Sequence, residues 1–228
     1  PSHQATLTPH GIEPIDLVAV NLYPFAEVIA RPDVPRQEAL EQIDIGRPAL
    51  VRSAAKNYQS VAVLVDPADY TPVLTDLRAT GHVTAERRWQ LAQKAFAHTA
   101  QYDARIAAYL SQDQPPWQLE AGSDGAVFPE TLTLTFSKVQ DLRYGENPHQ
   151  RAAFYVEDAP SSTSIANARQ LNGKELSYNN LLDLDAAKAI VSEFAQPAAC
   201  VIKHNNPCGC AVGESLAIAF DKAYEGDP

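Results

Sequence analysis

Short apolar runs and helical periods alternate along the first half of the chain. The apolar runs, which are typical of buried strands, cover residues 15–20 and 61–65. Apolar positions at intervals of three or four residues predict four helices. The first covers residues 35–43, the second begins at Pro48, and the third includes Leu74 and Leu77. The fourth is long and runs from an N-cap at Thr84 to about Leu110. This alternation predicts an α/β fold in which helices cover both faces of a parallel sheet.

A polar segment, residues 112–125, separates this half from the rest of the chain. It is acidic and rich in turn-forming residues, as linkers are. We therefore predict two domains, residues 1–125 and residues 126–228. In the second domain the pattern predicts strands at residues 132–136, 152–156 and 198–202, and helices at residues 180–194 and 214–224.

Composition and charge narrow the classes of partner. Of the 228 residues, 45% are apolar and 20% are charged, which is enough apolar material for a core without metal or disulfide bonds. The formal net charge of -10 argues against nucleic acid, because a phosphate backbone would be repelled. No run approaches the roughly 18 apolar residues of a membrane span, and no signal peptide opens the chain, so we expect no membrane partner.

The cysteines and the chain ends add two expectations. Cys200, Cys208 and Cys210 are an odd number in one short stretch, whereas a secreted disulfide framework spreads an even number along the chain. We therefore expect a reducing cytosol. The chain starts at Pro1 without an initiator methionine and ends at Pro228 directly after a helical pattern, so we expect a piece of a longer protein.

Polar residues gather at three places where an α/β sheet would hold a ligand, and the first follows the first strand. Asn21 and Tyr23 come after that strand, Asp44-Ile45-Gly46 opens a helix, and Lys56 lies further along the same helix. Free N–H groups at a helix start suit a phosphate, and a carboxylate with a lysine suits proton transfer. An Asx turn, an ordinary helix cap and a surface lysine explain the same residues without a ligand.

Two further clusters lie in the second domain. Within residues 142–150, Arg143 stands next to Tyr144, a pair that suits a phosphate or a planar base, although a capped surface loop has the same composition. A predicted buried strand delivers Lys203 and His204 into a loop, where two adjacent bases suppress each other's charge, so that one can accept a proton near pH 7. A buried pair without function is the alternative.

A metal site beside these bases is disfavoured. His204, Cys208 and Cys210 are ligand types, but Cys208-Gly209-Cys210 is not the P-C-x-x-C motif of zinc nucleobase deaminases, and no H-x-E motif accompanies it. We therefore expect no zinc. A catalytic thiol is also disfavoured, because neither cysteine has a distinctive partner motif.

Six motifs, in this order, resemble the family of bifunctional purine-biosynthesis proteins in which an AICAR transformylase is joined to an IMP cyclohydrolase. They are Asn21-Leu22-Tyr23-Pro24-Phe25, Gln42-Ile43-Asp44-Ile45-Gly46, Arg52-Ser53-Ala54-Ala55-Lys56-Asn57, residues 142–150, residues 170–180, and Lys203-His204 through Pro207-Cys208-Gly209. They extend over nearly the whole chain, and together they are far more specific than any one alone.

The resemblance implies a fold and a reaction for each domain. Residues 1–125 would be a methylglyoxal-synthase-like IMP cyclohydrolase domain that lacks its N-terminal part. Residues 126–228 would be the start of an AICAR transformylase domain with a cytidine-deaminase-like α/β fold and no zinc. In this family, 10-formyltetrahydrofolate formylates AICAR ribotide, and formyl-AICAR ribotide then closes to IMP with loss of water. Family members are homodimers with sites built across the interface, so we expect a homodimer.

The motifs also imply a role for each matched residue. His204 would be the general base for the 5-amine of the ribotide, with Lys203 beside it, and the ribotide would be bound by Arg143, Tyr144, Asn172 and Gly173. Tyr23, Asp44 and Lys56 would close the ring, while Asn21 and the backbone of Ile45 and Gly46 hold the nucleotide. Arg47 replaces the second glycine that the family usually has, so it either changes the shape of this loop or adds a phosphate contact.

Two alternatives stay open beside a complete enzyme. The family's phosphate-binding N-terminal loops would lie before Pro1 and its folate-binding parts after Pro228, so the chain could be a catalytically incomplete ribotide-binding fragment. The other alternative is a zinc-dependent nucleobase deaminase, which stoichiometric zinc in the purified protein would support.

Overall fold

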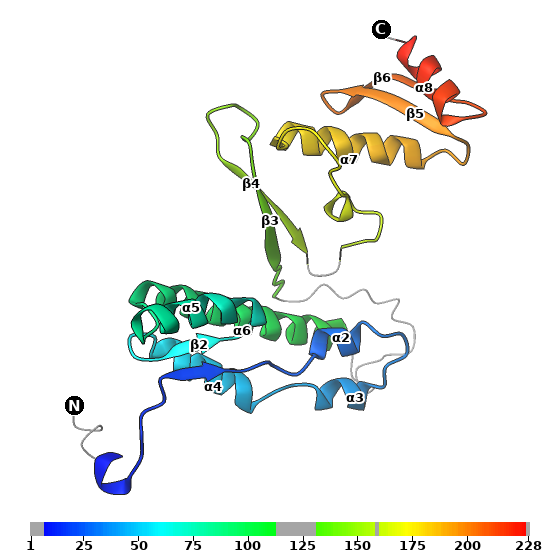
Figure 1. The fold of residues 1–228 in the computed structure, drawn as a ribbon. Helices are drawn as coiled ribbons and strands as arrows, with labels where there is room; N and C mark the ends of the chain where they lie inside the picture. Colours follow the sequence, from blue (N-terminus) through cyan, green and yellow to red (C-terminus); the bar gives the residue numbers. More distant parts are fainter. Residues whose placement is uncertain (1–6, 113–130, 158–159, 227–228) are drawn as a thin grey trace. The chain divides into compact units, whose positions relative to one another are not determined.

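The structure, a computed structural model, describes residues 7–112, 131–157 and 160–226 (Figure 1). The chain divides into two compact units, residues 1–134 and residues 135–228. Among the described residues, the first unit is built around one parallel pair of strands and the second around two antiparallel hairpins. The fold is therefore mixed α/β.

The first unit places two short parallel strands among helices. In chain order its elements are η1 (Thr8–His10), β1 (Leu17–Ala19), α2 (Phe25–Ile29), α3 (Arg36–Glu41), α4 (Gly46–Lys56), β2 (Ala62–Leu64), η2 (Pro67–Asp69), α5 (Tyr70–Thr80) and α6 (Ala85–Gln112). A strand or helix thus lies at each position that the hydrophobic pattern predicts in this half. Thr84 caps α6 as expected, because its Oγ1 accepts a hydrogen bond from the Arg87 N–H at 3.2 Å.

β2 is buried on both faces, whereas Leu17 and Ala19 of β1 are exposed, so the prediction of a sheet covered on both faces holds for β2 and not for β1. Val61, Val63 and Val65 pack against α4 and α6 through Val51, Ala54, Ala55, Ala92 and Ala95. Ala62 and Leu64, on the opposite face, pack with Val73, Val83 and Leu91. The two sets alternate along the chain because successive side chains of a strand point to opposite faces.

The second unit contains two hairpins and two α-helices in its described residues. β3 (Phe136–Leu142) pairs with β4 (Ala152–Glu157), and β5 (Ala198–Lys203) pairs with β6 (Asn206–Val212). Between the hairpins in the sequence lie η4 (Ile165–Asn167) and α7 (Tyr178–Ser192), and α8 (Leu216–Tyr224) follows β6. α7 and α8 both pack against the β5–β6 hairpin, one on each side (Figure 1).

Two predictions beyond residue 130 are wrong. The strand predicted at residues 132–136 begins only at Phe136, because β4 ends at Glu157, directly opposite Phe136. The segment after Lys203 is not an open loop. His204 and Asn205 have φ angles of 52° and 63°, the left-handed conformation of both residues in a type I′ turn, and this turn leads directly into β6. Of the predicted linker, residues 113–125 lie outside the described residues, and Gln112 ends α6.

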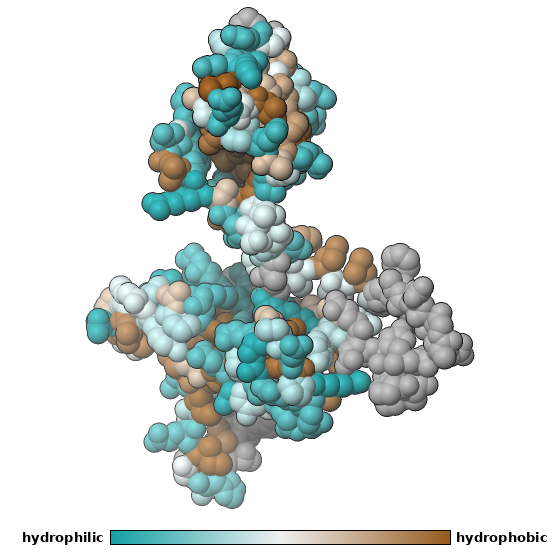
Figure 2. All heavy atoms as spheres, turned by 90° about the vertical axis from the view of Figure 1, so that its right-hand side faces the viewer, coloured by the Kyte–Doolittle hydropathy of each residue, from teal (hydrophilic) through white to brown (hydrophobic). Residues whose placement is uncertain are grey.

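Exposed apolar side chains occur on both units (Figure 2). On α8, Leu216 is 67% exposed and Phe220 is 52% exposed, whereas Ala219 and Ala223 are buried. The side of α8 that carries the small residues therefore packs on the hairpin. In the part of the chain that the structure describes, no helix has both the length and the hydropathy of a membrane span.

Candidate functional sites

Asp44 is the centre of the candidate site in the first unit. It lies in the loop between α3 and α4 and is only 8% exposed. Its Oδ1 accepts a hydrogen bond from the Arg47 N–H at 3.0 Å, and its Oδ2 accepts one from the Tyr23 N–H at 3.4 Å. The carboxylate therefore caps the start of α4 and holds the loop after β1 against it.

The Arg47 side chain contacts three of the predicted site residues. Its Nε lies 3.7 Å from Asp44 Oδ2, its Nη1 donates to the Asn21 carbonyl at 3.4 Å, and its guanidinium carbon lies 4.5 Å from the centroid of the Tyr23 ring. Arg47 belongs to α4 and does not have a positive φ, so this loop needs no second glycine. The guanidinium instead adds positive charge beside a helix N-terminus, which suits an anionic ligand.

Tyr102 of α6, which the sequence analysis missed, fixes the backbone on both sides of Ile43. Its hydroxyl accepts a hydrogen bond from the Asp44 N–H at 2.8 Å and donates one to the Gln42 carbonyl at 2.8 Å. Burial raises the pKa of this phenol, so it keeps its proton for the second bond. A tyrosine on the buried face of a helix usually has a hydrogen-bond partner for its hydroxyl, so the place of Tyr102 in the helical pattern could have indicated such a contact.

The other predicted residues of this site lie at different distances from Asp44. Gly46 is the first residue of α4, and a Cβ built on it would meet no atom within 4 Å. The Ile45 side chain is 78% exposed. Lys56 is exposed and is the last of the 11 residues of α4, about 15 Å from Gly46 along the helix axis. The structure thus brings together Asn21, Tyr23, Asp44 and Gly46, but not Lys56.

A second polar cluster, also missed, follows β2. Lys94 Nζ lies 2.7 Å from Asp66 Oδ2 and 2.8 Å from Asp69 Oδ2. The hydrogen bond from Lys94 lowers the pKa of the Asp66 carboxyl. His98 lies one turn further along α6, where burial lowers the pKa of its imidazole and its Nε2 has no hydrogen-bond partner. These groups join the segment at the carboxyl end of β2 to α6.

In the second unit, three of the four residues expected to bind the ribotide line one hollow of about 470 Å³. They are Arg143, Asn172 and Gly173, which come from two separate loops. α7 contributes Asn180 and Asp183 to the same lining. Residues that are distant in the sequence therefore meet around a space with amide, carboxylate and guanidinium groups at its wall.

The fourth residue, Tyr144, lies beside Arg143 without lining this hollow. The Arg143 guanidinium carbon lies 4.8 Å from the centroid of the Tyr144 ring, and its Nη2 donates to the Tyr144 hydroxyl at 3.1 Å. The Arg143 N–H donates to the Leu176 carbonyl at 2.9 Å, and the Tyr178 N–H donates to the Tyr144 carbonyl at 3.1 Å. These bonds hold the Arg143 loop to the start of α7.

Lys203 and His204 lie at the end of the β5–β6 hairpin, and both are exposed. The Asn205 N–H donates to Asp183 Oδ1 at 2.9 Å. Because Asp183 also lines the hollow, this hydrogen bond ties the turn that carries His204 to the wall of the hollow. Asp183 was missed by the sequence analysis, which treated its segment only as a helix.

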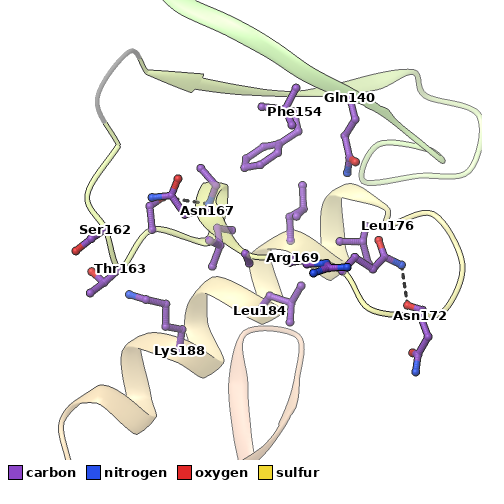
Figure 3. A pocket seen from close by; sticks show the side chains of 17 residues that line it. Gln140, Phe154, Ser162, Thr163, Asn167, Arg169, Asn172, Leu176, Leu184 and Lys188 are labelled. Atoms are coloured by element: carbon purple, nitrogen blue, oxygen red, sulfur yellow. Dashed lines mark hydrogen bonds between the residues drawn. The ribbon is translucent and has the colours of Figure 1, made fainter. Parts of the chain in front are cut away.

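A neighbouring hollow of about 670 Å³ shares Gln170, Asn172, Leu176 and Leu184 with the first. Gln140, Phe154, Arg169 and Lys188 line it from the β3–β4 hairpin, the loop before α7 and α7 itself (Figure 3). Gln170 Nε2 donates to the carbonyls of Asn172 at 3.0 Å and Lys174 at 2.8 Å. These bonds surround Gly173, whose φ of 94° is open to glycine but rarely to other residues.

In the described ranges, no three His, Cys, Asp or Glu side chains come together as a metal would require.

Comparison with known proteins gives matches along the whole chain. Residues 54–228 match the family described as "AICARFT/IMPCHase bienzyme". The bifunctional purine biosynthesis protein PurH of Anoxybacillus flavithermus is 56% identical over 227 residues, which are 100% of this chain and 42% of that protein. PurH of Bacillus subtilis is 53% identical over 225 residues, again with 42% of its length covered. A solved structure described as "Crystal structure of ForH" is 38% identical, covers 48% of this chain and 57% of its own, and has a TM-score of 0.43.

The chain thus spans about two fifths of the length of these curated relatives, at 42%. The family match covers more than half of the chain and includes the motifs around Arg143, Asn172 and His204. The motifs around Tyr23 and Asp44 lie before it, within the stretch that aligns with the PurH relatives. The chain belongs to the AICARFT/IMPCHase bienzyme family.

Proposed function

We propose that this chain contributes to the final two steps of de novo IMP synthesis. The first is formyl transfer from 10-formyltetrahydrofolate to AICAR ribotide, and the second is cyclodehydration of formyl-AICAR ribotide to IMP. The observation that supports this best is the meeting of Arg143, Asn172 and Gly173, from two separate family motifs, around one hollow. The corresponding enzyme is a phosphoribosylaminoimidazolecarboxamide formyltransferase and IMP cyclohydrolase that acts in the cytosol.

Each unit takes one of the two reactions in this proposal. The first unit is part of an IMP cyclohydrolase domain with a methylglyoxal-synthase-like fold, which its small parallel sheet with helices packed on both faces of β2 supports. The second unit belongs to an AICAR transformylase domain with a cytidine-deaminase-like fold. The family also leads us to propose a homodimer, with neither nucleic acid nor membrane as a partner.

In the second unit, the exposed Arg143 guanidinium offers a planar fork for the phosphate of AICAR ribotide, and Asn172 and Gly173 offer amide groups. His204 would accept a proton from the 5-amine as that nitrogen attacks the formyl carbon. Lys203, next to it, would stabilise the negative charge on the formyl oxygen of the tetrahedral intermediate. The formyl–folate bond then breaks, and the folate nitrogen leaves with a proton.

In the first unit, the start of α4 and Arg47 would hold the phosphate of formyl-AICAR ribotide, with Asn21, Ile45 and Gly46 against the nucleotide. The Arg47 guanidinium contacts both the Tyr23 ring and the Asp44 carboxylate, so these two side chains lie on either side of one group. They would move the protons as the amide nitrogen attacks the formyl carbon and water leaves. Lys56 enters this proposal on its motif alone, because α4 places it away from the others.

Titration of the chain with AICAR ribotide tests the hollow directly. The substitution Arg143→Gln removes the guanidinium and should weaken the binding of AICAR ribotide about tenfold or more. Hydrogen bonds to charged groups contribute roughly 1.5–3 kcal/mol. The matched control is Arg151→Gln, which removes an exposed arginine outside the hollow and should leave the affinity unchanged. If both variants bind AICAR ribotide as tightly as the unchanged chain does, the ribotide does not bind in this hollow.

A further inference from the structure

Cys200 of β5 and Cys210 of β6 are directly opposite each other in the antiparallel hairpin. The register runs without interruption from Ala198 opposite Val212 to Val201 opposite Gly209, so the irregularity between Val201 and Ile202 does not affect this pair. Both cysteines are free thiols in the structure. Directly opposite residues on paired strands present their side chains to the same face of the sheet.

The pair occupies the closer of the two kinds of position in an antiparallel ladder. The Gly213 N–H donates to the Pro197 carbonyl at 3.0 Å, which makes residues 197 and 213 a hydrogen-bonded pair. Such pairs alternate with non-hydrogen-bonded pairs along a ladder, and Cys200 and Cys210 are three positions further on. They are therefore a non-hydrogen-bonded pair, whose Cα atoms lie about 4.5 Å apart. That spacing lies within the range that disulfide bonds span.

The surroundings of the two sulfurs agree with this geometry. The Cys200 Sγ lies 3.6 Å from the Ala187 carbonyl of α7. On the other face, Gly209 lies so close to α8 that a Cβ there would be 1.8 Å from the Ala223 carbonyl oxygen, so α8 does not intervene between the two cysteines. Burial raises the pKa of the Cys200 thiol, and the neighbouring Cys210 raises it further. Cys210 is exposed, so a reagent in solution reaches it.

We propose that Cys200 and Cys210 form a reversible disulfide site that exchanges with small-molecule disulfides such as oxidised glutathione. The Cys210 thiolate attacks one sulfur of glutathione disulfide, and one glutathione thiolate leaves. The Cys200 thiol then loses its proton and attacks Cys210 in the mixed disulfide, and the second glutathione leaves. Two protein thiols lose two protons and two electrons, and one glutathione disulfide becomes two glutathione molecules. This inference does not depend on the proposed function.

To test the proposal, the folded chain is incubated with mixtures of reduced and oxidised glutathione, and the exchange is stopped with acid. Free thiols are then blocked, and disulfide bonds are mapped by peptide mass spectrometry. We expect one bridge, between Cys200 and Cys210, and a free Cys208. The Cys208→Ser variant should form the same bridge, whereas Cys200→Ser should stop at a glutathione adduct on Cys210. In urea the selectivity should be lost, and roughly tenfold more oxidised glutathione should be needed for the same bridged fraction.

Two results would overturn the proposal. One is a native chain that stays fully reduced, or bears only glutathione adducts, in the most oxidising mixture. The other is a bridge that includes Cys208, or that Cys208→Ser abolishes. Circular dichroism before the quench shows that each variant is folded, so that a missing bridge reports the chemistry of the pair.

Discussion

At the residue scale, one tyrosine hydroxyl holds together the loop that presents Asp44. Tyr102 bonds both the Asp44 N–H and the Gln42 carbonyl. Tyr102→Phe leaves both backbone groups without this partner, so we expect a loss of roughly 1–3 kcal/mol in the free energy of unfolding. Urea unfolding followed by circular dichroism measures the loss.

Tyr109→Phe is the matched control for this prediction. Tyr109 belongs to the same helix and packs edge-on against Phe25 with 5.6 Å between ring centroids, as Tyr102 does at 6.2 Å. Removing its hydroxyl should change stability by less than about 0.5 kcal/mol, the usual limit for a substitution away from such features. If both variants lose the same free energy of unfolding, the two hydrogen bonds of the Tyr102 hydroxyl do not stabilise the fold.

His98 gives the first unit a pH dependence of known sign. Burial, followed by the positive charge of Arg105, lowers the pKa of His98 in the folded state below its ordinary value of 6.5. As the pH falls through that value, the unfolded state takes up the proton first, so stability falls with it. His98→Gln removes this titration, and its free energy of unfolding should change less between pH 7 and pH 5 than that of the unchanged chain.

Urea unfolding at several pH values measures the two slopes. His82→Gln is the control, because His82 is an exposed histidine on the loop before α6. A His98→Gln slope as steep as the original would contradict the assignment of this pH dependence to His98.

At the element scale, a hydrogen bond between α7 and the β5–β6 turn fixes the turn that carries His204. Asp183 Oδ1 is the acceptor for the Asn205 N–H. Asp183→Ala removes the acceptor, so we expect the Asn205 amide to exchange with solvent about threefold to tenfold faster, the equivalent of a net hydrogen bond of roughly 0.5–1.5 kcal/mol. Asp183→Asn keeps a carbonyl oxygen there and should stay within about twofold of the original rate.

Amide exchange measured by NMR distinguishes these variants without relying on catalysis. If Asp183 positions the catalytic turn as the proposed function requires, Asp183→Ala should also lower kcat of formyl transfer more than it raises KM, and Asp183→Asn should restore most of it. An Asn205 amide that exchanges equally in all three proteins would show that the bond does not hold the turn.

Elements with a strong local period could be predicted from the sequence, and those set by tertiary contacts could not. α6 follows from its apolar positions and from the Thr84 cap, both of which are local. β6 was missed because Pro207 and Gly209 are poor strand formers by composition. Gly209 is needed there because α8 packs against its backbone, and no local pattern shows that approach.

The same distinction applies to the candidate sites. Motif resemblance found Arg143, Asn172 and Gly173, which the structure brings to one hollow. It could not find Tyr102 or Asp183, whose contacts join positions 58 and 22 residues apart. Lys56 was expected beside Asp44, but the rise of α4 separates them, a distance that a motif in a linear sequence does not show.

At the scale of the whole molecule, the proposed function assigns two successive reactions to separate sites, one in each unit. The first site centres on Asp44 and the second on the hollow beside the His204 turn, and no residue belongs to both. Loss of one site should therefore leave the other reaction intact. A single shared site would instead lose both reactions together.

The most direct test measures IMP formation by the intact gene product that carries this sequence, with two substrates in separate assays. Supplied with AICAR ribotide and 10-formyltetrahydrofolate, His204→Ala should lose about a hundredfold or more of its rate, but it should still convert formyl-AICAR ribotide to IMP. Asp44→Asn should do the reverse and accumulate formyl-AICAR ribotide. If folded samples of either variant lose both reactions equally, or if the unchanged protein makes no IMP from either substrate, the account of two separate sites is wrong.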